Sequence, residues 1–244
     1  MAVDFALVLV LGLVAGTLGG IVGFGTSIMV MPALVLVFGP REAVPIMAIA
    51  SIMANASRVA AWWREVDWRA VGAYSATAVP AAALGAATLL ALPGRAVEGV
   101  LGAFFIAMIP LRRWMARQAW RLGLGHLALL GAGIGFLTGI VASTGPINAP
   151  FFLAYGLVKG AYLSTEALSS LAVYLAKAVT FRSLGALPLD IVGKGLVVGS
   201  SLVAGAFIAK RYVRQLDAER FRLLMDGLLL AAGATMLWAA LGAR

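Results

Sequence analysis

Most of this chain consists of apolar stretches long enough to cross a lipid bilayer, and this excludes a soluble globular fold. One transmembrane helix needs about 20 apolar residues. Six stretches have about that length: Glu42–Trp63, Ala70–Leu92, Ala96–Met115, Tyr162–Leu184, Ile191–Ala209 and Phe221–Leu241. Hydrophobic residues make up 62% of the 244-residue sequence and charged residues 12%, roughly half the charged share of soluble domains. We therefore expect an all-α integral protein that crosses the cell (inner) membrane several times.

Two further apolar stretches, at residues 3–38 and 127–157, do not fit single spans. Each has about 30 residues or more, which is too long for one upright helix and short for two. Glycine and proline interrupt both, at Gly23-Phe-Gly25 through Pro32 and at Ser143-Thr-Gly-Pro146 through Pro150. A helix that breaks and turns back as a short second leg fits these lengths best. The sequence therefore predicts two broken helical hairpins.

The distribution of basic residues favours these hairpins. The two strongest clusters are residues 112–121, with four arginines, and residues 210–222, with one lysine and four arginines. The positive-inside rule places both clusters in the cytoplasm. Three single crossings between them would separate them, whereas a hairpin over residues 127–157 keeps them on one side. The same rule applied to the first hairpin places the Arg64–Arg69 loop inside and both termini outside.

This arrangement predicts two inverted repeats, residues 1–122 and 123–244, each a broken hairpin followed by three spans. Short matches recur at an offset of 119 residues: Gly20-Ile-Val22 with Gly139-Ile-Val141, Ser51 with Ser170, and Arg58 with Lys177. Inverted repeats with broken helices are typical of secondary transporters, whose substrate binds near the midplane where the broken helices meet.

The two breaks are the first candidates for a binding site. Irregular backbone inside a membrane survives only where it is buried in protein or lines a cavity. The start of the helix after each break directs free N–H groups and partial positive charge outward, which suits an anion. The alternative is that the glycines only allow close helix packing, which we prefer for the scattered Gly12, Gly16 and Gly131. The break residues predicted to bind substrate are Gly23, Gly25, Thr26, Ser27, Ser143, Thr144, Gly145 and Asn148.

Charged residues within spans are the second set of candidates. Arg58 and Lys177 each follow a polar residue, Asn55 or Tyr174, by three positions on the same helical face. A cation beside a hydrogen-bonding neighbour in both halves suits an anion with several oxygens, although Arg58 could instead extend to the headgroups. A buried carboxylate for proton coupling would have to be Glu166 or Asp226. The simpler readings are a helix cap for Glu166 and an i,i+4 pair with Arg222 for Asp226.

The composition excludes most other functions. The chain has no cysteine and one histidine, His126, so we expect no metal site, no thiol chemistry and no cofactor. Because the basic residues lie in short clusters between apolar stretches, the net charge of +9 does not indicate nucleic-acid binding. We expect no enzyme activity; the partners are a small anion and the bilayer. An anion channel is the alternative, and an intramembrane hydrolase using Ser143 and Lys177 a more remote one.

The segment Gly-Ile-Val-Gly-Phe-Gly-Thr-Ser-Ile-Met-Val-Met-Pro-Ala-Leu, residues 20–34, resembles the glycine-rich, proline-ended signature of the TauE/SafE sulfite exporter family. The chain also resembles this family in size, repeated halves and order of spans. The second half departs from the signature at Ala142–Pro146. The resemblance implies a secondary transporter, usually an exporter, for sulfite, sulfoacetate or a related organosulfonate.

Overall fold

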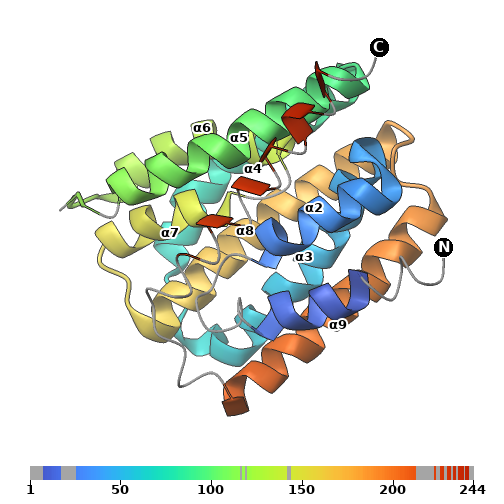
Figure 1. The fold of residues 1–244 in the computed structure, drawn as a ribbon. Coiled ribbons are helices and arrows are strands. Elements are labelled where there is room, and N and C mark those ends of the chain that lie inside the picture. Colours follow the sequence, from blue (N-terminus) through green and yellow to red (C-terminus); the bar gives the residue numbers. More distant parts are fainter. Residues whose placement is uncertain are drawn as a thin grey trace.

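The described residues of the computed structural model are 8–17, 26–115, 117–118, 120–141, 144–212 and part of 223–241. They fold into helices, and none of them forms a strand. The helices are Val8–Thr17, α2 Thr26–Phe38, α3 Pro40–Trp62, the short 3-10 helix Trp63–Glu65, α4 Trp68–Ala91, α5 Gly94–Met115, α6 Leu124–Ile140, α7 Gly145–Ala154, α8 Lys159–Ser183 and α9 Leu189–Tyr212 (Figure 1). The all-α membrane fold is therefore confirmed.

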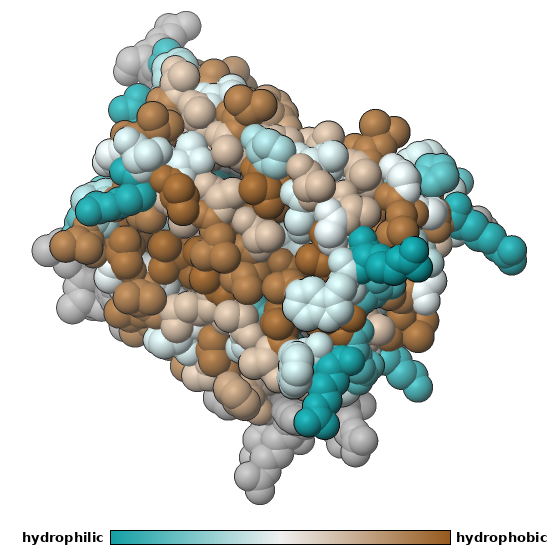
Figure 2. All heavy atoms as spheres, turned by 180° about the vertical axis from the view of Figure 1, so that it is seen from behind, coloured by the Kyte–Doolittle hydropathy of each residue, from teal (hydrophilic) through white to brown (hydrophobic). Residues whose placement is uncertain are grey.

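Four helical segments in the described part of the chain are long and apolar enough to span a membrane: Arg41–Glu65, Trp68–Ala91, Gly94–Met115 and Leu189–Phe207. They coincide with four of the predicted spans. The predicted span at residues 162–184 is also a long helix, α8, but it is more polar because Glu166, Lys177 and several buried hydroxyls lie along it. The last predicted span lies partly outside the described residues. Figure 2 shows a broad hydrophobic area across one face of the molecule, with hydrophilic residues gathered toward its ends.

The second predicted break is present. Helix α6 ends at Ile140 and α7 begins at Gly145. The ten residues of α7 cover about 15 Å, half of the hydrocarbon core. The N–H of Leu122 donates to the carbonyl oxygen of Ala154 at 3.1 Å, so the segment returns to the end of the molecule where it started. In the first half, residues 18–25 lie outside the described part, between the helix Val8–Thr17 and α2.

Glycines allow two pairs of helices to pack with their backbones in contact: α4 with α6, and α9 with the first helix. A Cβ atom added at Gly85 of α4 would lie 2.2 Å from the carbonyl oxygen of Phe136 in α6. One added at Gly205 of α9 would lie 2.2 Å from the carbonyl oxygen of Leu13 in the first helix. The scattered glycines behave in the same way, since Gly16 and Gly131 meet carbonyl oxygens of α9 and α4 at 2.2 and 2.5 Å. Close helix packing therefore explains them, as predicted.

Helices α3 and α8 contact each other in the interior, while α9 packs on α3 and α4 on α8 (Figure 1). Contacts between loops define two ends of the bundle. At one end, which we call the Arg64 end, the N–H of Asp67 donates to Thr165 Oγ1 at 2.9 Å and joins the α3–α4 connection to the start of α8. At the other, the Lys194 end, Lys194 and Glu42 join the starts of α9 and α3 at 2.8 Å.

The described basic residues after α5 lie toward the Arg64 end. Helix α5 begins near Arg41, at the Lys194 end, and its last turn brings Trp114 within 5.5 Å of Trp120, ring centre to ring centre. Trp120 in turn stacks on Phe151 of α7 at 5.3 Å. The side chains of residues 210–222 lie outside the described part.

Asp226 contacts α5, a helix that the sequence did not predict as its neighbour. It forms an ion pair with Arg113 of α5 at 2.5 Å, so its carboxylate links the last helical segment to α5. Arg222, the partner predicted from the i,i+4 spacing, lies outside the described residues.

Candidate anion-binding cavity

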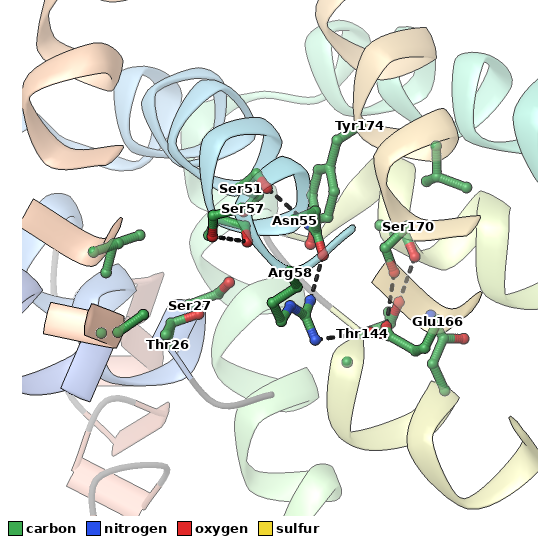
Figure 3. A pocket seen from close by; sticks show the side chains of 18 of the residues that line it. Thr26, Ser27, Ser51, Asn55, Ser57, Arg58, Thr144, Glu166, Ser170 and Tyr174 are labelled. Atoms are coloured by element: carbon green, nitrogen blue, oxygen red, sulfur yellow. Dashed lines mark hydrogen bonds and ion pairs between the residues drawn. The ribbon is translucent and has the colours of Figure 1, made fainter. Parts of the chain in front are cut away.

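A small cavity lies where α2, α3, α7 and α8 meet (Figure 3). Its volume is about 50 Å³, three or more times the roughly 10–15 Å³ that one water molecule requires. The cavity is thus large enough for a few waters or one small ion. The residues that line it are mostly polar: Thr26, Ser27, Ser51, Asn55, Ser57, Arg58, Tyr74, Thr138, Thr144, Gly145, Asn148, Glu166, Ser170 and Tyr174, with Gly16, Ala54, Val173, Leu202 and Ala206.

Arg58 supplies the positive charge of the cavity. Its guanidinium group donates to Glu166 Oε2 at 3.1 Å and to the side-chain oxygen of Asn55 one turn earlier on α3. The arginine side chain is 19% exposed and the glutamate side chain 2% exposed. Ser170 donates to the other carboxylate oxygen, Oε1, at 2.8 Å. Arg58 is therefore held at the cavity wall by groups from both α3 and α8, as Figure 3 shows.

The starts of two short helices also reach the cavity. Thr26 and Ser27 begin α2, and Thr144 and Gly145 stand at the start of α7. The first N–H groups of a helix have no partner within the helix and carry partial positive charge. Asn148, in the first turns of α7, is fixed by the hydroxyl of Tyr74, which donates to Asn148 Oδ1 at 2.8 Å. The start of α7 thus adds partial positive charge to a cavity whose arginine is paired with Glu166.

Ser51 contributes a buried hydroxyl to the cavity wall. Ser51 lines the cavity and is 3% exposed, and its Oγ has no hydrogen-bond partner among the described residues. Buried hydroxyls usually have a partner, because leaving one unpaired costs about 1–3 kcal/mol. A ligand or water in the cavity would satisfy this hydroxyl.

The cavity lies partway along α3. Arg58 lies six residues before Arg64 in the sequence, and Ser51 lies thirteen residues before Arg64. These separations correspond to about 9 and 20 Å along a helix. A hydrocarbon core of about 30 Å has its midplane at about 15 Å. The cavity therefore lies near the middle of the molecule along the α3 axis.

Lys177 has a different environment. It is fully buried, and its Nζ donates to the carbonyl oxygens of Thr138 at 2.7 Å and Val141 at 2.6 Å, where α6 ends. These carbonyls belong to the negative end of the helix dipole. Thr138 and Thr144 are also hydrogen-bonded to each other across the break. In the described part of the chain the ammonium thus holds backbone, and Lys177 is not one of the residues that line the cavity.

The cavity brings together eight of the residues predicted to bind substrate: Thr26, Ser27, Asn55, Arg58, Thr144, Gly145, Asn148 and Tyr174. Gly23, Gly25 and Ser143 lie outside the described residues. Five further polar residues line the cavity that were not predicted as site residues: Ser51, Ser57, Tyr74, Thr138 and Ser170. The sequence offered Glu166 as a carboxylate for proton coupling or, more simply, as a helix cap. The structure places it inside α8, facing Arg58. A lone acidic residue in an otherwise uncharged stretch was the signal that could have placed it.

Among the described residues, no group of three histidine, aspartate or glutamate side chains could hold a metal ion. A search of curated proteins and a search of solved structures gave no significant match. The family model described as sulfite exporter TauE/SafE matches residues 8–236, a range that includes both predicted breaks, α3, α8 and the whole cavity. The chain therefore belongs to the TauE/SafE sulfite exporter family, a family of transporters, and is a multi-pass membrane protein.

Proposed function

We propose that this protein is a secondary carrier that exports a small oxyanion, sulfite or an organosulfonate, across the cell membrane, and that the anion binds in the cavity beside Arg58. The observation that carries the proposal is the convergence of Arg58, the start of α7 and several hydroxyl and amide side chains on one cavity. Guanidinium N–H groups and helix N-termini are the donors that proteins use for oxyanions. The unpartnered hydroxyl of Ser51 adds a donor from the same wall.

The size of the cavity favours the smallest members of this substrate class. A cavity volume of about 50 Å³ holds a few water molecules. Sulfite, with four heavy atoms, is of similar size. An organosulfonate such as sulfoacetate is larger and requires the surrounding helices to separate. We therefore expect sulfite to bind more tightly than sulfoacetate.

The test is thermal unfolding of the detergent-purified protein with sulfite, sulfate, sulfoacetate, taurine, acetate and chloride at fixed ionic strength. A ligand that binds the native state raises its stability in proportion to RT ln(1 + [L]/Kd). We expect sulfite to give the largest rise, increasing with concentration, and chloride to give none. Equal shifts with all anions, or no shift with any, would contradict the proposal.

We further propose that residues 1–122 and 123–244 form inverted repeats, with the Arg64 end in the cytoplasm. Three observations support this. Helices α3 and α8 begin 119 residues apart, at Pro40 and Lys159. The first helix packs on α9 through glycines as α6 packs on α4. The hairpin at residues 122–154 returns to its starting end.

Because the chain has no cysteine, single cysteines can report the side on which each loop lies. We expect Gln118→Cys and Ala218→Cys to react with an impermeant maleimide from the cytoplasmic side, and Ser183→Cys to react from the opposite side. Labelling of Gln118→Cys and Ala218→Cys from different sides would contradict the inverted arrangement.

A further inference from the structure

The cation of the proposed site already has an anionic partner inside the protein. Arg58 and Glu166 are the charged residues among the described ones that line the cavity. They form an ion pair at 3.1 Å, with the carboxylate 2% exposed, and Ser170 donates to the second carboxylate oxygen. Without a bound anion, the pair therefore has no net charge.

An anion that binds Arg58 brings a second negative charge close to Glu166. Two anions a few ångströms apart in a buried site disfavour each other, and the weaker acid of the two then binds a proton. Sulfonic acids, and sulfurous acid as the parent of hydrogensulfite, are stronger acids than a carboxylic acid, so with either monoanion bound the proton goes to Glu166. A protonated carboxyl group can still accept the hydrogen bond from Ser170, and its own O–H becomes a donor for an oxygen of the bound anion.

The other groups that face Glu166 do not replace it as a proton acceptor. Tyr74 of α4 and Tyr162 of α8 lie in its electrostatic environment, and both are neutral phenols near pH 7. The cavity walls from α2, α6 and α7 contribute hydroxyls and an amide. Glu65 lies at Gly160, more than one turn before Glu166 and away from the cavity lining, and Lys177 holds the end of α6.

We propose that binding of the anion at Arg58 is accompanied by protonation of Glu166, so that the carrier takes up one proton together with each monoanion. The proton comes from solvent and forms an O–H bond on the carboxylate of Glu166, and no other bond is made or broken. This inference rests on the proposed function, because it requires that an anion binds beside Arg58. The occupied site then has the same net charge as the empty one for a monoanion.

The experiment counts protons by titrating sulfite calorimetrically into the purified protein in two buffers of different ionisation enthalpy. The pH is about 6, where sulfite is mostly the hydrogensulfite monoanion and an ordinary carboxyl group is ionised. It compares the wild type with Glu166→Gln, which keeps the shape of a protonated glutamate. Asp226→Asn is the matched control, since Asp226 is a buried carboxylate paired with Arg113 outside the cavity. All three proteins meet the same mixture of sulfite species, so a difference between them comes from the protein.

We expect the wild type and Asp226→Asn to take up about one more proton per bound sulfite than Glu166→Gln. The affinity of the wild type should fall more steeply with rising pH than that of Glu166→Gln. Equal proton uptake in all three proteins would overturn this inference while leaving the proposed function standing. Absence of sulfite binding by the wild type would overturn the proposed function and this inference with it.

If Glu166→Gln does not fold, infrared difference spectroscopy of the wild type gives the same answer. We expect the carbonyl band of a protonated carboxyl group to appear when sulfite is added, both in the wild type and in Asp226→Asn. Sulfite binding without that band would overturn the inference.

Discussion

Arg58 and Lys177 stand 119 residues apart, at matching positions of α3 and α8, but they contact different kinds of groups. Arg58 is partly exposed at the cavity wall and contacts side chains, Glu166 and Asn55. Lys177 is completely buried and contacts backbone, the carbonyl oxygens of Thr138 and Val141. The comparison teaches that two cations at the same spacing in the two halves of the chain need not share a role, because the nearest groups decide what a cation does.

The groups around Lys177 resemble those of a cation-binding site, except that the cation here is a side chain of the protein itself. In carriers with broken helices, carbonyl groups and helix C-terminal ends hold a coupling cation. Here an ammonium group occupies the end of α6 and lies 5.5 Å from the ring centre of Phe181. We therefore expect Lys177 to stabilise the break, while Arg58 contacts the transported anion.

The largest expected effect is the loss of stability in Lys177→Met. Methionine has a similar length but cannot donate, so two buried carbonyl groups would lose their partner at about 1–3 kcal/mol each. We expect the midpoint of thermal unfolding in detergent to fall by roughly 5–15 °C. Lys194→Met is the matched control, because Lys194 makes a partly exposed ion pair with Glu42 that contributes about 0–1 kcal/mol. Equal stability of the two variants would show that Lys177 does not hold the break.

A smaller effect tests whether the two halves pack alike. Alanine at Gly85 or at Gly205 places a methyl group 2.2 Å from a carbonyl oxygen of the facing helix. Such overpacking costs about 1–3 kcal/mol, and we expect similar losses of thermal stability in both variants. Gly72→Ala and Gly193→Ala are controls on the same two helices, where a new Cβ atom meets nothing within 4 Å. A large loss in one half alone would break the structural equivalence of α4 and α9.

The smallest effect is expected for Arg58→Lys. The variant keeps the charge but loses the planar fork of donors, which can bind Glu166 and an oxyanion at once. We expect sulfite affinity, measured by calorimetry, to fall about 3–10-fold, corresponding to roughly 1 kcal/mol, with little change in thermal stability. Affinity equal to that of the wild type would indicate that only the charge of Arg58 matters.

The sequence predicted the parts of this fold that depend on local pattern. Long apolar stretches with few charged residues predicted the spans, and proline and glycine predicted the break between α6 and α7. The three-residue spacing of Asn55 and Arg58 predicted the contact between their side chains. These features can be read within one helix or at one helix end.

The partners across the interior could not be predicted in this way. Glu166 is 108 residues from Arg58 in the sequence, and Tyr74 is 74 residues from Asn148. Which face of α3 meets which face of α8 depends on the packing of the whole bundle. For the same reason, the sequence suggested an anion as the partner of Lys177, whereas the structure places the end of α6 there.

The most direct test of the proposed site is equilibrium binding of sulfite to Arg58→Gln beside the wild type and Arg182→Gln. Arg182 donates to the carbonyl oxygen of Leu187 at the end of α8, away from the cavity. We predict that Arg58→Gln lowers sulfite affinity at least tenfold, about 1.4 kcal/mol, while Arg182→Gln binds like the wild type. Wild-type affinity in Arg58→Gln, in a protein that remains folded, would contradict the placement of the anion site in this cavity.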